Sequence, residues 1–157
     1  MKNLNFKQVL LFLVTLVFSM ASCKPKNANN TISADAAAKV YVAPGKYDEF
    51  YNFVSGGFSG QMSAYGLPSG RLLRVIPVFS VDPEKGYGFS EETKPMLNTS
   101  HGFVPWDDLH HVQLSKTNGD YDGKWVFGNA NNTPRVARID LKTFRTAEII
   151  ELPNSAG

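Results

Sequence analysis

Apolar residues recur most regularly in the last third of the chain, where short strand-like runs alternate with turns. The runs lie at residues 109–115, 124–129, 135–141 and 146–152, and polar or glycine-rich residues separate them. Short runs with this spacing predict antiparallel strands. Four such strands, about ten residues apart, are typical of one blade of a β-propeller, in which the first strand lies nearest the central axis.

The first half of the chain carries fewer regular runs. Gly60–Tyr65 and Arg71–Phe79 are strand-like, and the glycine- and proline-rich segment between them predicts a hairpin. The second run is apolar enough to be buried on both faces, with Pro77 at a bulge or at the strand end. Residues 39–42 predict another short strand. The aromatic residues between 47 and 54 fit a helical turn or a packed loop equally well.

The N-terminus has the pattern of an export signal. Lys2 and Lys7 precede an apolar run at residues 9–18, which is too short to span a membrane but suits a secretory signal. Small residues then lead to the sole cysteine, Cys23, as in a bacterial lipobox, where the thiol is lipidated. An ordinary cleaved signal is the alternative. The first arginine is Arg71, which excludes a twin-arginine signal and predicts export by the general secretory (Sec) route to the periplasm.

Composition divides the chain into three segments. Residues 1–22 form the predicted signal, residues 23–38 a flexible linker rich in Asn, Ala, Ser and Thr, and residues 39–157 the folded part. The chain holds 11 Phe, 6 Tyr, 2 Trp, 13 Gly and 9 Pro, a balance that favours short strands over a helical bundle. Without the signal, 14 basic and 14 acidic side chains remain. This neutral balance, with no basic stripe, excludes nucleic-acid binding.

The candidate chemistry lies in the segment Trp106–His111, at the start of the first of the four strands. Two of the three histidines, His110 and His111, are adjacent here, behind two aspartates. Neutral imidazole is the commonest protein ligand for copper, zinc and iron, and a carboxylate such as Asp108 commonly orients the ring. Adjacent strand residues point to opposite faces. The pair can therefore share a site only at a strand start, in a bulge, or on different atoms of a multinuclear cluster.

Two other interpretations of the histidines remain open at this point. The pair could lie in a solvated polar turn, since short motifs match by chance. A zinc hydrolase is disfavoured because no carboxylate stands at helical spacing from the pair to act as a base. The third histidine, His101, lies in the long loop 80–105 with no adjoining carboxylate or histidine. We expect an exposed or hydrogen-bonded loop residue there, although a loop of this length is usually functional.

Several extended motifs of the chain resemble the N-terminal part of the nitrous-oxide reductase family. They are Lys39–Tyr51, Gly56–Gln61, Arg71–Leu73 with Ile76–Phe79, Asp108–His111 and Asn132–Arg138. The resemblance covers nearly the whole chain after residue 38. It is greatest to the branch that is exported by the general secretory route.

The resemblance implies a periplasmic homodimer with a seven-bladed β-propeller followed by a cupredoxin domain. In this family a tetranuclear copper–sulfide cluster, ligated only by histidines on the propeller axis, reduces N2O to N2 and water. A dinuclear copper centre in the cupredoxin domain receives electrons from a periplasmic donor of the cytochrome c or cupredoxin type, and calcium can also be bound. His110 and His111 match the adjacent cluster ligands of the family, and Asp108 matches a residue that supports them.

We therefore expect an all-β chain that forms the N-terminal part of a seven-bladed propeller, preceded by a signal segment. It would contain about one full blade and an extra hairpin. The other cluster histidines and the cupredoxin domain would lie outside it, so the chain alone is expected to be inactive. The alternative from another class is a non-catalytic exported propeller module that binds a partner. Under either interpretation, lipidation of Cys23 would anchor the chain to the membrane.

Overall fold

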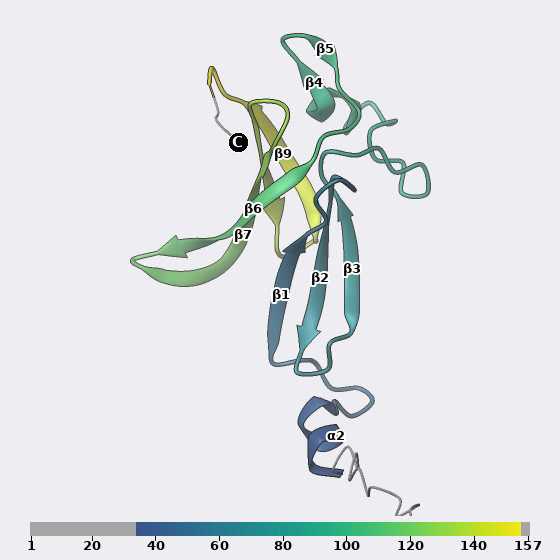
Figure 1. Cartoon of the computed structure of the whole chain (residues 1–157), viewed down its shortest axis with the longest axis vertical. Coiled ribbons are helices and arrows are strands. Elements are labelled where there is room, and N and C mark those ends of the chain that lie inside the picture. The colour runs from purple at the N-terminus through teal and green to yellow at the C-terminus, as the bar shows by residue number, and fades with distance from the viewer. Residues whose placement is uncertain (1–33, 155–157) are drawn as a thin grey trace, which may run out of the picture. The chain divides into compact units, whose positions relative to one another are not determined.

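The computed structural model describes residues 34–154, which separate into two compact units between Ala38 and Lys39 (Figure 1). The predicted signal and Cys23 lie outside the described residues. Helix α2 (Ala34–Val40) replaces the end of the predicted linker and the start of the strand predicted at 39–42. Four of its seven residues are alanine, the strongest helix former, and Asp35 and Lys39 complement the helix dipole. No helix within residues 34–154 is long and apolar enough to cross a membrane.

The second unit contains all the described strands and confirms the predicted all-β fold. Its first sheet has three antiparallel strands in the order β1 (Phe50–Ser55), β2 (Gln61–Leu67) and β3 (Leu72–Pro77). The predicted β2–β3 hairpin is confirmed, but β1 adds a third strand where a helical turn or loop was expected. The alternation of β1 is hidden in the sequence because Phe50 and Tyr51 are both exposed.

The prediction that Arg71–Phe79 is buried on both faces is wrong for its first half. Leu72 remains 54% exposed, whereas Ile76, Val78 and Phe79 are fully buried. Only the end of this run, around Pro77, reaches the second sheet, where the hydroxyl of Thr146 donates a hydrogen bond to the Pro77 carbonyl at 2.7 Å. Burial along the run therefore follows contact with the neighbouring sheet.

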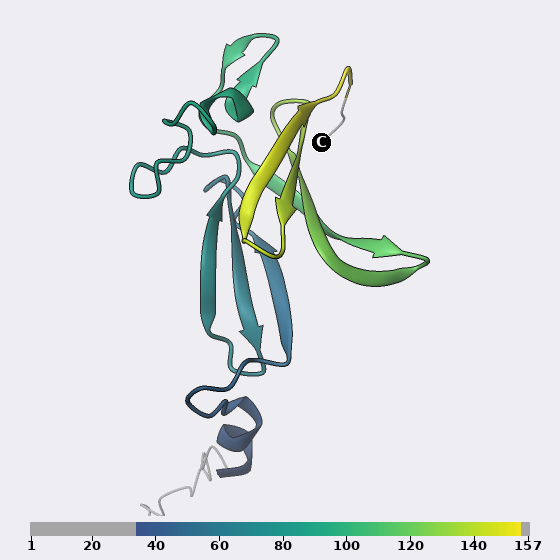
Figure 2. The same cartoon turned by 180° about the vertical axis from the view of Figure 1, so that it is seen from behind.

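The second sheet has four antiparallel strands, as the sequence predicts. Their order is β6 (Leu109–Thr117), β7 (Asp120–Ala130), β8 (Arg135–Asp140) and β9 (Arg145–Glu151). β6 and β7 are longer than expected, and their shared hairpin projects from the rest of the unit in both views (Figures 1 and 2). The loop between the sheets holds the 3-10 helix η1 (Lys94–Leu97) and the short pair β4 (Asn98–Thr99) and β5 (Gly102–Phe103).

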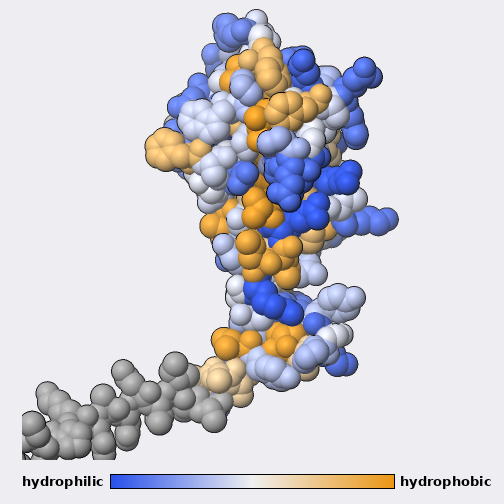
Figure 3. Space-filling view, turned by 90° about the vertical axis from the view of Figure 1, so that its right-hand side faces the viewer, coloured by the Kyte–Doolittle hydropathy of each residue, from blue (hydrophilic) through white to orange (hydrophobic). Residues whose placement is uncertain are grey.

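One hydrophobic core joins the two sheets. Its buried side chains come from β2, β3, the segment after β3, and β6 to β8: Met62, Ile76, Val78, Phe79, Leu109, Val126, Ala130, Ala137 and Ile139. Each large side chain among them contributes about 1.5–3 kcal/mol by leaving water. The outer surface is more mixed, and the side that carries β3 shows apolar and strongly hydrophilic side chains next to each other (Figure 3). Because Leu109, the first residue of β6, belongs to the core, the core fixes where β6 begins.

Candidate metal centre

The start of β6 is held by Leu109, which is fully buried in the core. Its backbone N–H donates a hydrogen bond to the carbonyl of Gly57 at 3.0 Å. On the neighbouring strand, a Cβ at Gly128 would lie 2.6 Å from a methyl carbon of Leu109, so only glycine leaves room for this side chain. The residue before the histidine pair is thus fixed from two sides.

A β-bulge separates the two histidines. His110 pairs with Asn129 and Gln113 pairs with Phe127, so that β6 advances three residues while β7 advances two. The backbone of His111 has a φ of +46°, in the left-handed region. This turn cancels the usual alternation of strand side chains. The two imidazole rings lie with their centres 5.8 Å apart and their planes at 67°. The pair thus meets the bulge condition under which adjacent histidines can share a site.

Each imidazole has a polar partner that leaves one ring nitrogen free. The Nε2 of His110 lies 3.3 Å from Oδ2 of Asp108, and Nδ1 of His111 lies 3.1 Å from Oδ1 of Asn129. The Asn129 amide nitrogen donates to the Ala130 carbonyl at 3.3 Å, so its oxygen faces His111 as an acceptor. Nδ1 of His111 then carries the hydrogen, and its Nε2 lone pair is available. For His110 the nitrogen away from the carboxylate is Nδ1.

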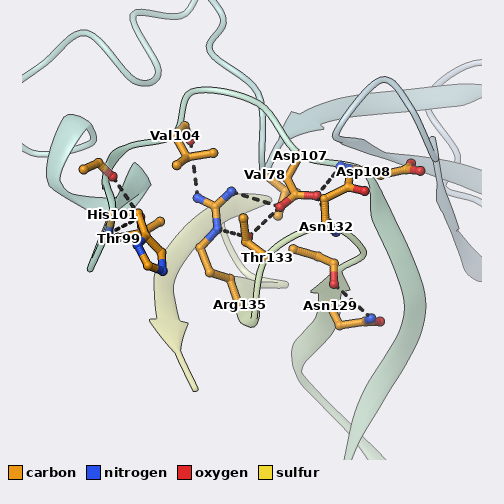
Figure 4. Close-up of polar contacts among 12 residues, drawn as sticks. Val78, Thr99, His101, Val104, Asp107, Asp108, Asn129, Asn132, Thr133 and Arg135 are labelled. Atoms are coloured by element: carbon orange, nitrogen blue, oxygen red, sulfur yellow. Dashed lines mark hydrogen bonds and ion pairs between the residues drawn. The ribbon is translucent and has the colours of Figure 1, made fainter. Parts of the chain in front are cut away.

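A buried ion pair between Asp107 and Arg135, whose side chains are 1% and 0% exposed, lies just before Asp108 in the chain (Figure 4). One carboxylate oxygen of Asp107 accepts the N–H groups of Asp108 at 2.7 Å and Asn132 at 2.9 Å. The other accepts the Thr133 hydroxyl at 2.5 Å and an Arg135 N–H at 3.3 Å. The carboxylate thereby fixes the backbone just before β6, at Asp108, and just after β7, at Asn132.

The protonation of Asp107 follows from the same contacts. Burial raises the pKa of this carboxyl, but hydrogen bonds from Thr133, from the Asn132 and Asp108 amides and from Arg135 outweigh it, so the net pKa is lowered. The guanidinium of Arg135 also lies 5.0 Å from the ring centre of Phe79 and donates to the Val104 carbonyl at 3.4 Å. Asp107 is therefore a charged structural anchor directly before Asp108.

The donor set fits part of a copper site. Two imidazoles with fixed partners and free nitrogens suit copper, and the carboxylate Oδ1 of Asp108 is buried without a hydrogen-bond partner. Within residues 34–154, no group of three or more His, Cys, Asp or Glu side chains is close enough to hold a metal ion. His101 is exposed and lies across Arg135 from Asp108, so it does not join the pair (Figure 4).

Sequence reasoning missed three residues that shape this site. Asn129 orients His111 from the next strand, and Arg135 supports the segment before Asp108 from a buried position on β8. Asp107 was noted only as the neighbour of Asp108. The register of the β6–β7 hairpin places Asn129 opposite His110 and would have pointed to Asn129. Arg135 stands at an inward position of the alternating strand 135–140, and this position would have pointed to a buried, paired arginine.

Known proteins resemble this chain over most of its described length. Nitrous-oxide reductases from Pseudomonas fluorescens and Stutzerimonas stutzeri are 42% and 40% identical over 76% of the chain. That of Cupriavidus necator is 36% identical over 85%. The chain is similar to nitrous-oxide reductases, as its motifs predict. It spans about a fifth of the length of these nitrous-oxide reductases, with 19–21% of each covered. No protein-family model matches the chain.

Proposed function

We propose that this chain is part of a copper enzyme that reduces nitrous oxide to dinitrogen and water, and that His110 and His111 supply two ligands of its copper centre. The observation that carries the proposal is the bulge, which gathers two oriented imidazoles at one strand start within a chain 42% identical to a nitrous-oxide reductase. This likeness favours an enzyme over a non-catalytic binding module. When bound, the copper would pass on the two electrons of the donor and provide the site at which N2O, with two protons, is reduced to N2 and water.

The residues of this chain would bind and orient. His110 would offer Nδ1 and His111 would offer Nε2, because Asp108 and Asn129 occupy the opposite nitrogens. Such partners fix the ring rotation and the tautomer, and their loss typically lowers metal affinity by about 10–100-fold. The remaining ligands must come from outside the described residues, since no third donor joins the pair within residues 34–154.

The proposal extends to the surroundings of the site. The sheet β6–β9 would be one propeller blade, with β6 nearest the axis, because four-stranded antiparallel sheets are the unit of propellers. The export pattern before residue 23 supports a periplasmic location. N2O would be the substrate, and a periplasmic electron carrier would be the donor.

The test is made in the reductase that contains this chain. Changing His110 or His111 to Ala should abolish the visible absorption of the copper centre and N2O reduction, because each change removes a ligand. Changing the exposed loop residue His101 to Ala is the matched control and should leave both unchanged. An Asn129→Ala variant should bind copper about 10–100-fold more weakly while keeping both histidines. Normal absorption and activity in the His110 or His111 variant would refute the assignment.

A further inference from the structure

A cavity of about 300 Å³ lies on a different part of the second unit from the histidine pair. The end of β3, the loop after Asp82 and the turn before β9 surround it, and its lining contains Arg74, Lys85, Tyr87, Glu92, Phe144 and Arg145. Its size is at the lower end of the range for small-molecule sites. Neither His110 nor His111 lines it, so it is independent of the proposed copper site.

The hydroxyl groups in the lining already have hydrogen-bond partners. Tyr87 donates to the Val78 carbonyl at 2.9 Å, and burial raises the pKa of this phenol to about 12, so it stays neutral. Thr146 donates to Pro77, and the hydroxyls of Ser90 and Thr93 lie 2.7 Å from each other. These contacts hold the walls in place without offering a negative charge to the cavity.

The two arginines of the lining are different. The guanidinium groups of Arg74 and Arg145 have no hydrogen bond or ion pair with any residue in 34–154. Lys85, by contrast, lies 3.3 Å from Asp82 and donates to the Val75 carbonyl. The lining therefore has two exposed guanidinium groups without an ion-pair partner among the described residues and a single acidic side chain, Glu92.

The turn that carries Arg145 is fixed by its neighbour. Phe144 has a φ of +53°, which is uncommon for a residue with a side chain. Its ring packs 5.7 Å from Tyr51 and 6.0 Å from Phe53, centre to centre, and these contacts hold the turn against β1. The backbone strain is thus kept directly beside one of the two free guanidinium groups. Strain of this kind is often found at ligand sites.

We propose that this cavity binds a small oxyanion, a phosphate or a carboxylate, between Arg74 and Arg145. Guanidinium groups bind both anions through paired, charge-assisted hydrogen bonds. Arg74 and Arg145 have no partner of their own within residues 34–154, so both are available to bind an anion in the cavity. Both arginines line the cavity, so the anion would be bound by their charges.

The experiment measures binding of inorganic phosphate and of acetate to the purified reductase that contains this chain, by titration calorimetry at constant ionic strength. Wild type should bind one of the two with a dissociation constant of about 1 mM or lower. Arg74→Gln and Arg145→Gln should each weaken binding at least about tenfold, because each removes a charged donor. Arg74→Lys and Arg145→Lys keep the charge but lose the paired geometry, and should fall between wild type and the Gln variants.

The control is Arg138→Gln, which removes the same charge at an ion pair outside the cavity. Its affinity should stay within about twofold of wild type. Phosphate binding without acetate binding identifies a phosphate site, and the reverse identifies a carboxylate site. Absence of binding of both anions at about 10 mM would overturn the proposal. So would equal weakening in Arg138→Gln, which indicates general charge attraction. If a Gln variant is unfolded by circular dichroism, the corresponding Lys variant decides.

Discussion

Replacing Asp107 with Asn tests whether the buried ion pair supports the start of β6. The change keeps the shape of the side chain but removes the charge that faces Arg135, whose side chain is 0% exposed. A buried cation is left with the Val104 carbonyl, the Thr133 hydroxyl and the face of Phe79 as its remaining contacts. Removing one partner of a buried pair typically costs about 3–5 kcal/mol.

We expect the free energy of unfolding of Asp107→Asn to fall by about 3–5 kcal/mol, measured by urea unfolding followed by tryptophan fluorescence. The double variant that adds Arg135→Met removes both charges. It should lose less than the two single variants together, because the residues are in contact. A loss below about 1 kcal/mol in Asp107→Asn, the level of an exposed pair, would refute the reasoning.

The same variant should change the dependence of stability on pH. Hydrogen bonds lower the pKa of Asp107 in the folded state despite its burial, so its carboxylate contributes stability above the unfolded pKa of about 4. That contribution is lost as the pH falls through the lowered folded value. Wild type should therefore lose stability below about pH 4 more steeply than Asp107→Asn, in the same unfolding assay.

Two further changes test the scaffold. Gly60→Ala should lower the free energy of unfolding by more than about 1 kcal/mol, because φ is +64° and a Cβ would lie 2.7 Å from the Asp107 carbonyl oxygen. The control is Gly45→Ala, where φ is +77° but the space around the Cβ is open, and it should lose less stability. Burial raises the pKa of Asp48, but hydrogen bonds, chiefly from Arg71, lower it overall, so the charged carboxylate stabilises the fold at neutral pH. Asp48→Asn should therefore lower the thermal midpoint at neutral pH and make the midpoint fall less steeply in acid. An unchanged midpoint at neutral pH would contradict this.

The four-stranded sheet was predictable because its strands obey local rules. The runs from 109 onwards have turn residues at their ends, and β8 shows the alternation of a strand most clearly, with every second residue buried. Local alternation cannot reveal β1, since whether Phe50 and Tyr51 face a core depends on a sheet far away in sequence. The helix at Ala34–Val40 could have been predicted from its alanines, but the low complexity around it favoured a linker.

The residues of the proposed site could be predicted from the sequence, but their geometry could not. Two adjacent histidines behind Asp108 predict a pair of metal ligands. A bulge, by contrast, depends on how β6 and β7 pair and cannot be recognised from the amino-acid composition. Asn129 is an ordinary strand residue until the hairpin register places it opposite His110. Arg135 likewise becomes an anchor only when Asp107, 28 residues earlier, folds against it.

The bulge and the buried ion pair are best understood together. A histidine at φ of +46° is in a conformation that costs on the order of 1–3 kcal/mol, and a regular strand would avoid it by sending His111 to the opposite face. The strain persists only if the flanking segments cannot relax. Leu109 is fixed in the core on one side, and Asp107 accepts one hydrogen bond from Asp108 and two from the segment after β7, besides one from Arg135 on β8. Burial raises the pKa of Asp107, but hydrogen bonds from Thr133, the Asn132 and Asp108 amides and Arg135 lower it overall and favour the charged carboxylate. The buried ion pair thus provides the rigidity that His110 and His111 would need in order to share the proposed site.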